Sequence, residues 1–135
     1  MKIDFDEMKK ILSVFLEANT ACITLQNLGF FSMKHDETEL FLFHFSLLAE
    51  AGLISDQALS SNSLEALGIV FHSGGVGGRA LPIRLTMAGH DFAKALNQKP
   101  VLERIKKELS DAPFGVVKKA AGQWFSKVLE DKLGL

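Results

Sequence analysis

The sequence predicts a small α+β fold, in which helices at both ends of the chain flank a short antiparallel β-hairpin. Apolar residues recur at helical spacing in five segments, of which the first contains Met8, Ile11, Leu12 and Phe15. Two short apolar segments near the middle are separated by a glycine-rich stretch, a pattern typical of a hairpin. The chain has 135 residues, which suits one domain around one apolar core.

The first elements are a helix, a short strand and a turn. Asp4 followed by Glu7 is typical of a capped helix start, and the helical spacing continues over residues 4–18. Residues 21–25 are short, partly β-branched and bounded by polar residues, so we expect a short strand there. Residues 26–29 are expected to form a turn.

A second helix is expected over residues 36–51. Asp36 and Glu39 repeat the capping spacing, and Gly52 ends the helix as a glycine commonly does. This helix is apolar on more than one face, which is typical of a central helix or of one that another chain covers. Residues 26–35 are compatible either with a further degenerate helix or with irregular structure.

The hairpin is expected to pair residues 67–72 with residues 81–85. Residues 73–79, which contain four glycines, are then its flexible loop. Pro82 cannot donate a hydrogen bond within a sheet, which places it at an edge or at the start of a strand.

Three helices follow the hairpin. Thr86 is placed to cap a helix over residues 87–96, and Pro100 suits the first turn of a helix over residues 101–109. A final helix is expected over residues 114–133. Its apolar stripe contains Phe114, Val117, Ala121, Trp124, Phe125, Val128 and Leu129.

This order of elements follows the winged-helix plan, a form of helix-turn-helix in which the hairpin is the wing. Residues 1–97 are expected to form the winged-helix-like part, and residues 98–135 a C-terminal helical extension packed on it within a single domain. The helix at 36–51 then takes the place of the third helix, which in such folds lies in the DNA major groove.

Two motifs resemble a specific family. Residues 44–54 have the form H-x-x-L-L-x-E-A-G-L-I, and residues 85–92 have the form L-T-x-x-G-H-D-F. Together with residues 113–135, they resemble the uncharacterised small bacterial and phage winged-helix proteins of the YjcQ group. The resemblance covers most of residues 4–135 and implies the fold. It implies no activity, because that group has no known function.

Patterns for catalysis and cofactor binding are weak in this chain. Residues 75–80 match G-x-G-x-x-A, but a strand rather than a helix is expected next, so we interpret them as hairpin. The four histidines form no H-x-x-x-H pair, and Cys22 is the only cysteine. No sequence pattern brings Cys22 or a serine to His72 or His90. We therefore predict no enzyme and no catalytic, metal or cofactor site.

Charge argues against the DNA-binding role that the fold suggests. The net charge of −1 divides into −5 over residues 1–93 and +4 over residues 94–135. The helix at 36–51 has four acidic residues and no Lys or Arg, whereas DNA recognition requires basic side chains. A DNA-binding transcriptional regulator therefore remains the alternative prediction, carried by Arg79 and Arg84 near the wing and by the basic C-terminal helices.

The preferred prediction is a non-enzymatic winged-helix module that binds a protein partner or a second copy as a homodimer. The candidate interaction surface is aromatic and contains Phe41, Phe45, Trp124 and Phe125. The single cysteine fits a reducing cytoplasm, and the acidic N-terminus does not fit a secretory signal. No apolar run is long enough to suggest a membrane span.

Overall fold

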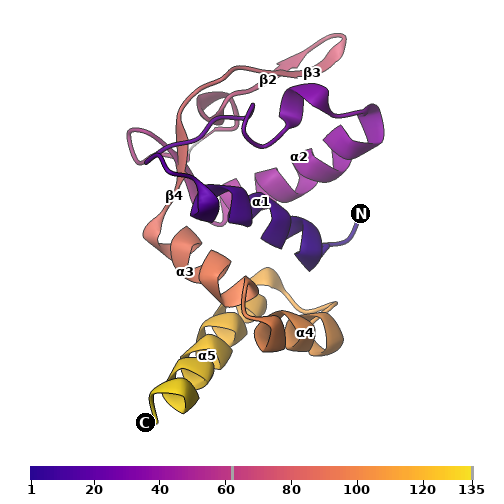
Figure 1. Ribbon diagram of the computed structural model, residues 1–135. Coiled ribbons are helices and arrows are strands. Elements are labelled where there is room, and N and C mark those ends of the chain that lie inside the picture. The colour runs from indigo at the N-terminus through magenta and orange to yellow at the C-terminus, as the bar shows by residue number, and fades with distance from the viewer. Residues whose placement is uncertain (62, 135) are drawn as a thin grey trace.

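The computed structural model describes residues 1–61 and 63–134, and it confirms an α+β fold with a long C-terminal helix (Figure 1). The helices are α1 (Phe5–Glu17), α2 (His35–Glu50), α3 (Met87–Leu96), α4 (Lys99–Glu108) and α5 (Phe114–Leu133). The strands are β1 (Ile54–Asp56), β2 (Ile69–His72), β3 (Gly75–Gly78) and β4 (Ile83–Leu85). Two short 3₁₀ helices are η1 (Phe30–Ser32) and η2 (Glu65–Leu67). In Figure 1, α1, α2 and the strands form the upper part, and α3 leads to α4 and α5 below.

The start of α1 is capped as predicted, but its second capping contact differs. The Asp4 carboxylate accepts hydrogen bonds from the backbone N–H groups of Asp6 and Glu7, at 2.9 and 3.1 Å. The backbone N–H of Asp4 donates to Nε2 of His44 in α2, at 2.8 Å. His44 therefore takes the place that a Glu7 side chain would fill in a capping box, and it ties α1 to α2.

The predicted cap of α2 at Asp36 is wrong by two residues. The helix begins at His35 with Lys34 as its N-cap residue, and the Lys34 N–H donates to the Glu37 carboxylate at 3.1 Å. The acidic residues of the first turn still interact favourably with the helix dipole. The helix ends as predicted, because Gly52 has a φ of 73° and closes the C-terminal turn.

The predicted hairpin pairing is also wrong. β2 pairs with β3, from Ile69 opposite Gly78 to His72 opposite Gly75, so the glycine-rich stretch is itself a strand. The turn is reduced to two residues, Ser73 and Gly74. β3 packs on η1 so closely that a Cβ at Gly78 would lie 2.8 Å from the Phe30 ring. A side chain would be excluded here, which explains a glycine in a strand.

β4 pairs elsewhere and joins three distant segments. It lies antiparallel to β1, with Ile54 opposite Leu85. On its other side, Ile83 and Ile23 exchange backbone hydrogen bonds of 2.9 and 2.8 Å. The strand predicted at 21–25 is therefore a single bridge. Within residues 26–35, for which the sequence left two possibilities, the chain forms the short helix η1.

The main core lies between α1, α2 and this small sheet. The Phe41 and Phe45 rings of α2 stack with centroids 5.0 Å apart, and the Phe30 ring meets Phe41 edge-on at 5.6 Å. Residues that are completely buried include Met8, Leu12, Leu25, Phe45, Leu48, Leu53, Ile54 and Ile83. Burial of this apolar surface is the main stabilising contribution to the fold.

α3 is joined tightly to the turn between α2 and β1, at Gly52 and Leu53. The Thr86 hydroxyl accepts from the Gly89 N–H at 3.0 Å, as predicted for an N-cap, and donates to the Gly52 carbonyl at 2.7 Å. A Cβ at Gly89 would overlap the backbone carbonyl of Leu53, so only glycine allows this approach. α4 and α5 then pack on α3 and on each other. Among the described residues, no helix is long and apolar enough to cross a membrane.

Candidate functional site: the groove between α3 and α5

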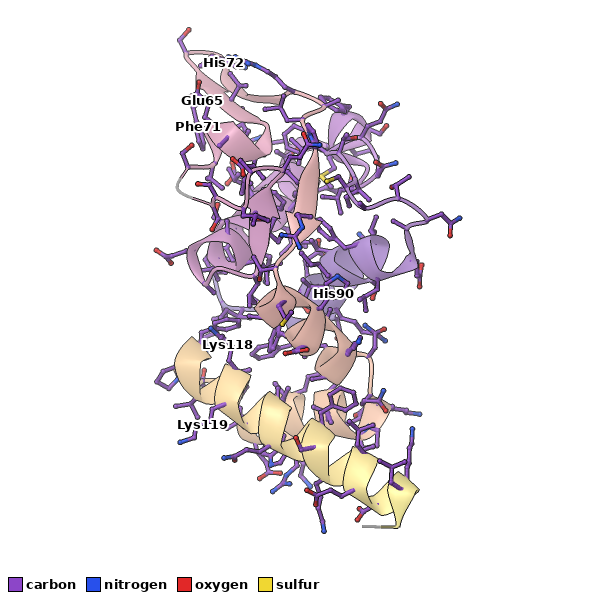
Figure 2. The ribbon with its side chains drawn as sticks, turned by 90° about the vertical axis from the view of Figure 1, so that its left-hand side faces the viewer. Glu65, Phe71, His72, His90, Lys118 and Lys119 are labelled. Atoms are coloured by element: carbon purple, nitrogen blue, oxygen red, sulfur yellow. The ribbon has the colours of Figure 1, made fainter. Side chains whose placement is uncertain are left out.

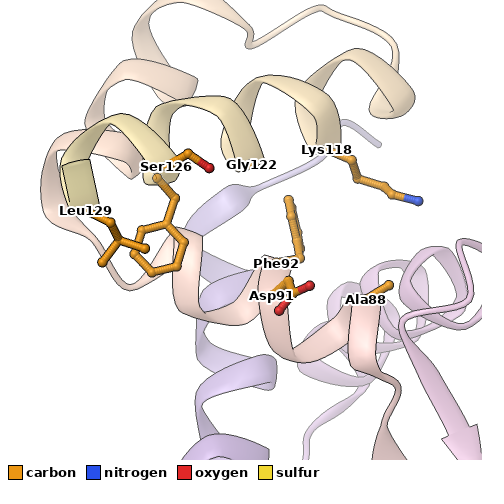
Figure 3. Close-up of a pocket in the computed structure, with 8 residues that line it drawn as sticks. Ala88, Asp91, Phe92, Lys118, Gly122, Ser126 and Leu129 are labelled. Carbon is orange, nitrogen blue, oxygen red and sulfur yellow. The ribbon is translucent and has the colours of Figure 1, made fainter. Parts of the chain in front are cut away.

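A groove of about 400 Å³ lies between α3 and α5 (Figure 3). The α3 side is formed by Ala88, Asp91 and Phe92. The α5 side is formed by Lys118, Gly122, Phe125, Ser126 and Leu129. Its size is within the range of sites that bind small molecules or the side chains of a partner protein.

The groove exists because α5 is buried more completely in its first half than beyond Gly122. Phe114 meets Phe92 edge-on at 5.5 Å, and Val117 and Ala121 are completely buried. At Gly122, no described neighbour lies within 4 Å of the position that a Cβ would take. Beyond this glycine, the apolar residues on the groove side of α5 are only partly covered. Leu129 is 42% exposed.

The two aromatic residues predicted for the surface of α5 have different environments. Trp124 lies on the α4 side, where the Arg104 guanidinium is 4.1 Å from the ring centroid in a cation–π contact. Arg104 also pairs with Glu108 at 2.7 Å. Phe125 is half-buried and lines the α3–α5 groove. Only Phe125 of this pair is therefore placed to meet a partner in the groove.

Phe41 and Phe45 are not part of an interaction surface. Their exposed fractions are 1% and 0%, because α1, η1 and the small sheet cover the apolar side of α2. The sequence prediction that assigned them to a partner surface is wrong, since the chain buries them itself. What α2 leaves exposed is largely acidic and includes Asp36, Glu39 and Glu50.

The two predicted DNA-binding arginines do not share the hairpin. Arg79 is exposed directly after β3, and its backbone N–H donates to the Gly68 carbonyl at 2.7 Å. Arg84 is half-buried within β4, which belongs to the other sheet. In Figure 2, Phe71 and His72 of the hairpin lie at the top of the molecule, and Lys118 and Lys119 of α5 lie in its lower half. Hairpin and basic helices therefore do not form one continuous basic surface.

Titratable side chains that the sequence singled out have structural roles. His44 is completely buried, accepts from the Asp4 N–H and contacts the Leu40 carbonyl through Nδ1 at 2.8 Å. His72 Nδ1 accepts from the Gly74 N–H at 3.2 Å and so supports the hairpin turn. Among residues 1–61 and 63–134, no three His, Cys, Asp or Glu side chains are grouped closely enough to hold a metal ion.

The rim of the groove contains two opposite charges, one on each side. Asp91 extends from α3 and Lys118 from α5. Within the described chain, neither side chain has an ion-pair partner within 4 Å. The groove thus combines an apolar lining with charges that the chain leaves available for another molecule.

Asp91, Lys118 and Leu129 were not predicted from the sequence as a group. The signal was present in the final helix, whose predicted apolar stripe includes Phe125 and Leu129, and the structure leaves both of them partly exposed. Gly122 interrupts that stripe and leaves space where a larger residue would have filled the groove.

No family model, curated protein or solved structure matches this chain. The resemblance to the YjcQ group stays a prediction, and Leu135, the last residue of that resemblance, lies outside the described residues. The function is therefore argued from the geometry of the groove.

Proposed function

We propose that this chain is a non-enzymatic, winged-helix-like module that binds a protein segment in the α3–α5 groove. The observation that carries the proposal is the groove itself, which has an apolar lining and an unpaired charge on each side. Apolar clefts with a few polar groups are typical of sites that recognise a helix by its apolar face. The order of α1, η1, α2, the small sheet and the β2–β3 hairpin supports the winged-helix-like assignment.

The charge of α2 supports a protein partner over duplex DNA. In a winged-helix fold, α2 takes the position of the helix that reads the major groove, yet it has no Lys or Arg. A duplex would meet the exposed carboxylates of Asp36, Glu39 and Glu50 there. Phosphate neutralisation requires several basic contacts, and the hairpin provides only Arg79 at its base.

Selection of helix-forming peptides tests this function. Displayed peptides are selected on the wild-type protein, and their affinity is then compared with that for Leu129→Lys, which places a charge in the apolar part of the groove. We expect this variant to weaken binding by about tenfold or more. Phe71→Lys is the matched control, because Phe71 is exposed in the hairpin and far from α5, and its affinity should equal that of the wild type.

Two outcomes would overturn the proposal. One is that selected peptides bind equally well to Leu129→Lys, which would place the binding surface elsewhere. The other is binding of duplex DNA with a steep salt dependence, measured by a mobility shift at low and moderate salt, which would favour the DNA-binding alternative.

A further inference from the structure

The α3–α5 groove continues along α5 as a stripe of small residues and two exposed leucines, up to the end of the helix. Gly122, Ser126, Leu129 and Leu133 follow one another at spacings of three and four residues, so they share one face of the helix. Leu133 is 70% exposed and Met87, in the first turn of α3, is 81% exposed. Two long apolar side chains thus extend the groove beyond its lining.

The charged and apolar parts of the groove lie at different ends. Figure 3 shows Lys118 and Ala88 toward one end and Leu129 toward the other. Asp91 and Lys118 are on opposite sides, α3 and α5. A two-fold axis along the groove would therefore place the α5 of each copy over the α3 of the other. It would bring Asp91 of each copy near Lys118 of the other and keep the apolar ends together.

The size of this face is at the lower end of what a stable dimer needs. α5 has 20 residues, so it is about 30 Å long. With α3 packed beside it at about 8–10 Å, the two helices present a face about 20 Å wide. A face of these dimensions covers at most about 600 Å², against the ~600–1,000 Å² per partner that standard interfaces bury. The groove alone is smaller than this, which is why the exposed stripe matters.

We infer that a second copy of this chain occupies the α3–α5 groove in a two-fold dimer, with Asp91 of each copy opposite Lys118 of the other. The inference rests on the proposed function and names its partner. The apolar residues of the stripe provide most of the affinity, since exposed ion pairs contribute little alone. The charges fix the orientation, because reversing one of them places like charges together at two points of the interface.

Sedimentation equilibrium of charge-reversal variants tests the inference. The wild type should be dimeric at micromolar concentration. Asp91→Lys and Lys118→Asp should each raise the dimer dissociation constant by at least about tenfold. An equimolar mixture of the two variants should regain wild-type association, because each cross pair again joins opposite charges. The double variant Asp91→Lys with Lys118→Asp should also regain it.

Charge-matched controls separate this effect from a general effect of net charge. Lys107→Asp and Glu103→Lys change the net charge by the same amounts on the exposed side of α4 and should leave the dimer unchanged. Leu129→Lys should give a monomer, also in mixtures. Circular dichroism melting of each variant verifies that it is folded.

The inference is overturned if the wild type is monomeric at all concentrations, if the single reversals dimerise normally, or if the mixture shows no rescue. Failure here is distinct from failure of the proposed function. A monomeric wild type whose groove still binds selected peptides would exclude the second copy as partner and keep the groove as a binding site. In a dimeric wild type, the same peptides should dissociate the dimer.

Discussion

Two helix pairs in this chain, α1 with α2 and α3 with α5, are built from similar apolar residues and pack to different degrees. In the first pair, η1 and the small sheet cover the remaining apolar side of α2, and Phe45 is completely buried. In the second pair, α5 packs mainly on α3 and α4 within the described part of the chain, and Phe125 stays half-buried beside an open groove. The comparison indicates that the number of covering elements, rather than the apolarity of a helix, decides whether its face is core or surface.

The largest expected effect tests this difference with the same substitution in both pairs. Phe45→Ala should lower the free energy of unfolding by about 3–5 kcal/mol, because it leaves a cavity in a closed core. Phe125→Ala should cost about 1 kcal/mol, since the ring is already partly hydrated. Urea unfolding of both variants measures the two losses in the free energy of unfolding. Equal losses would show that the α3–α5 pair is as closed as the α1–α2 pair.

A second test uses glycines in α3 and α5. Gly89→Ala should cost about 3 kcal/mol, because the added methyl group overlaps the Leu53 carbonyl and forces α3 away from the turn that precedes β1. Gly122→Ala should instead stabilise the helix by up to ~1 kcal/mol, because open space lies above it. Thermal unfolding measures both changes. If Gly89→Ala is neutral, the close contact between α3 and Leu53 is not present in solution.

A third test concerns the polar contact inside the closed pair. His44→Leu should cost about 1–3 kcal/mol, because it leaves the Asp4 N–H without its acceptor. Urea unfolding of this variant measures the loss. NMR of the wild-type imidazole should show a neutral ring protonated on Nδ1, since Nε2 accepts from Asp4. The opposite tautomer would contradict the hydrogen bond from the Asp4 N–H to His44 that joins α1 to α2.

The smallest expected effect is at the surface, where α4 meets α1. Lys106 donates to Asp6 at 2.9 Å, and this hydrogen bond raises the pKa of the Lys106 amine above its usual 10.5. Folding therefore favours the charged amine. The small contribution of this ion pair to stability is complete below the usual lysine pKa, and it is lost as the pH rises through the raised pKa of Lys106. Lys106→Met should be slightly less stable than the wild type at neutral pH, and the difference in urea midpoint should vanish at high pH.

The neighbouring variant Lys107→Met is the control, since within the described residues Lys107 has no ion pair. A difference for Lys106→Met that persists unchanged at high pH would show that the ion pair is not its cause.

Much of the helical structure could be predicted from sequence, because its signals are local. Apolar spacing and single capping residues placed α1, α3 and α5 to within about one residue, with Asp4, Thr86 and Gly134 at their ends. Strand pairing is not local. The glycines of β3 looked like a loop, but they pair with β2, and the position of Phe30 explains the glycine at residue 78.

The candidate site could be predicted only in part, for the same reason. Phe125 was identified, but Phe41 and Phe45 have the same residue type and are covered by segments distant in sequence. Asp91 and Lys118 are unremarkable in sequence, and they become significant only because packing places them on opposite sides of one groove.

The central position of β4 has a consequence for how the chain is made. Synthesis proceeds from the N-terminus, and Ile23 and β1 have no partner strand until residues 83–85 leave the ribosome. We expect stalled chains of increasing length to become resistant to protease only after β4 has emerged, and early resistance would show that α1 and α2 close without it. Until then, the phenylalanines of α2 are exposed on a nascent chain. A chaperone acting during synthesis would therefore find its binding site at Phe41 and Phe45, which the mature protein buries.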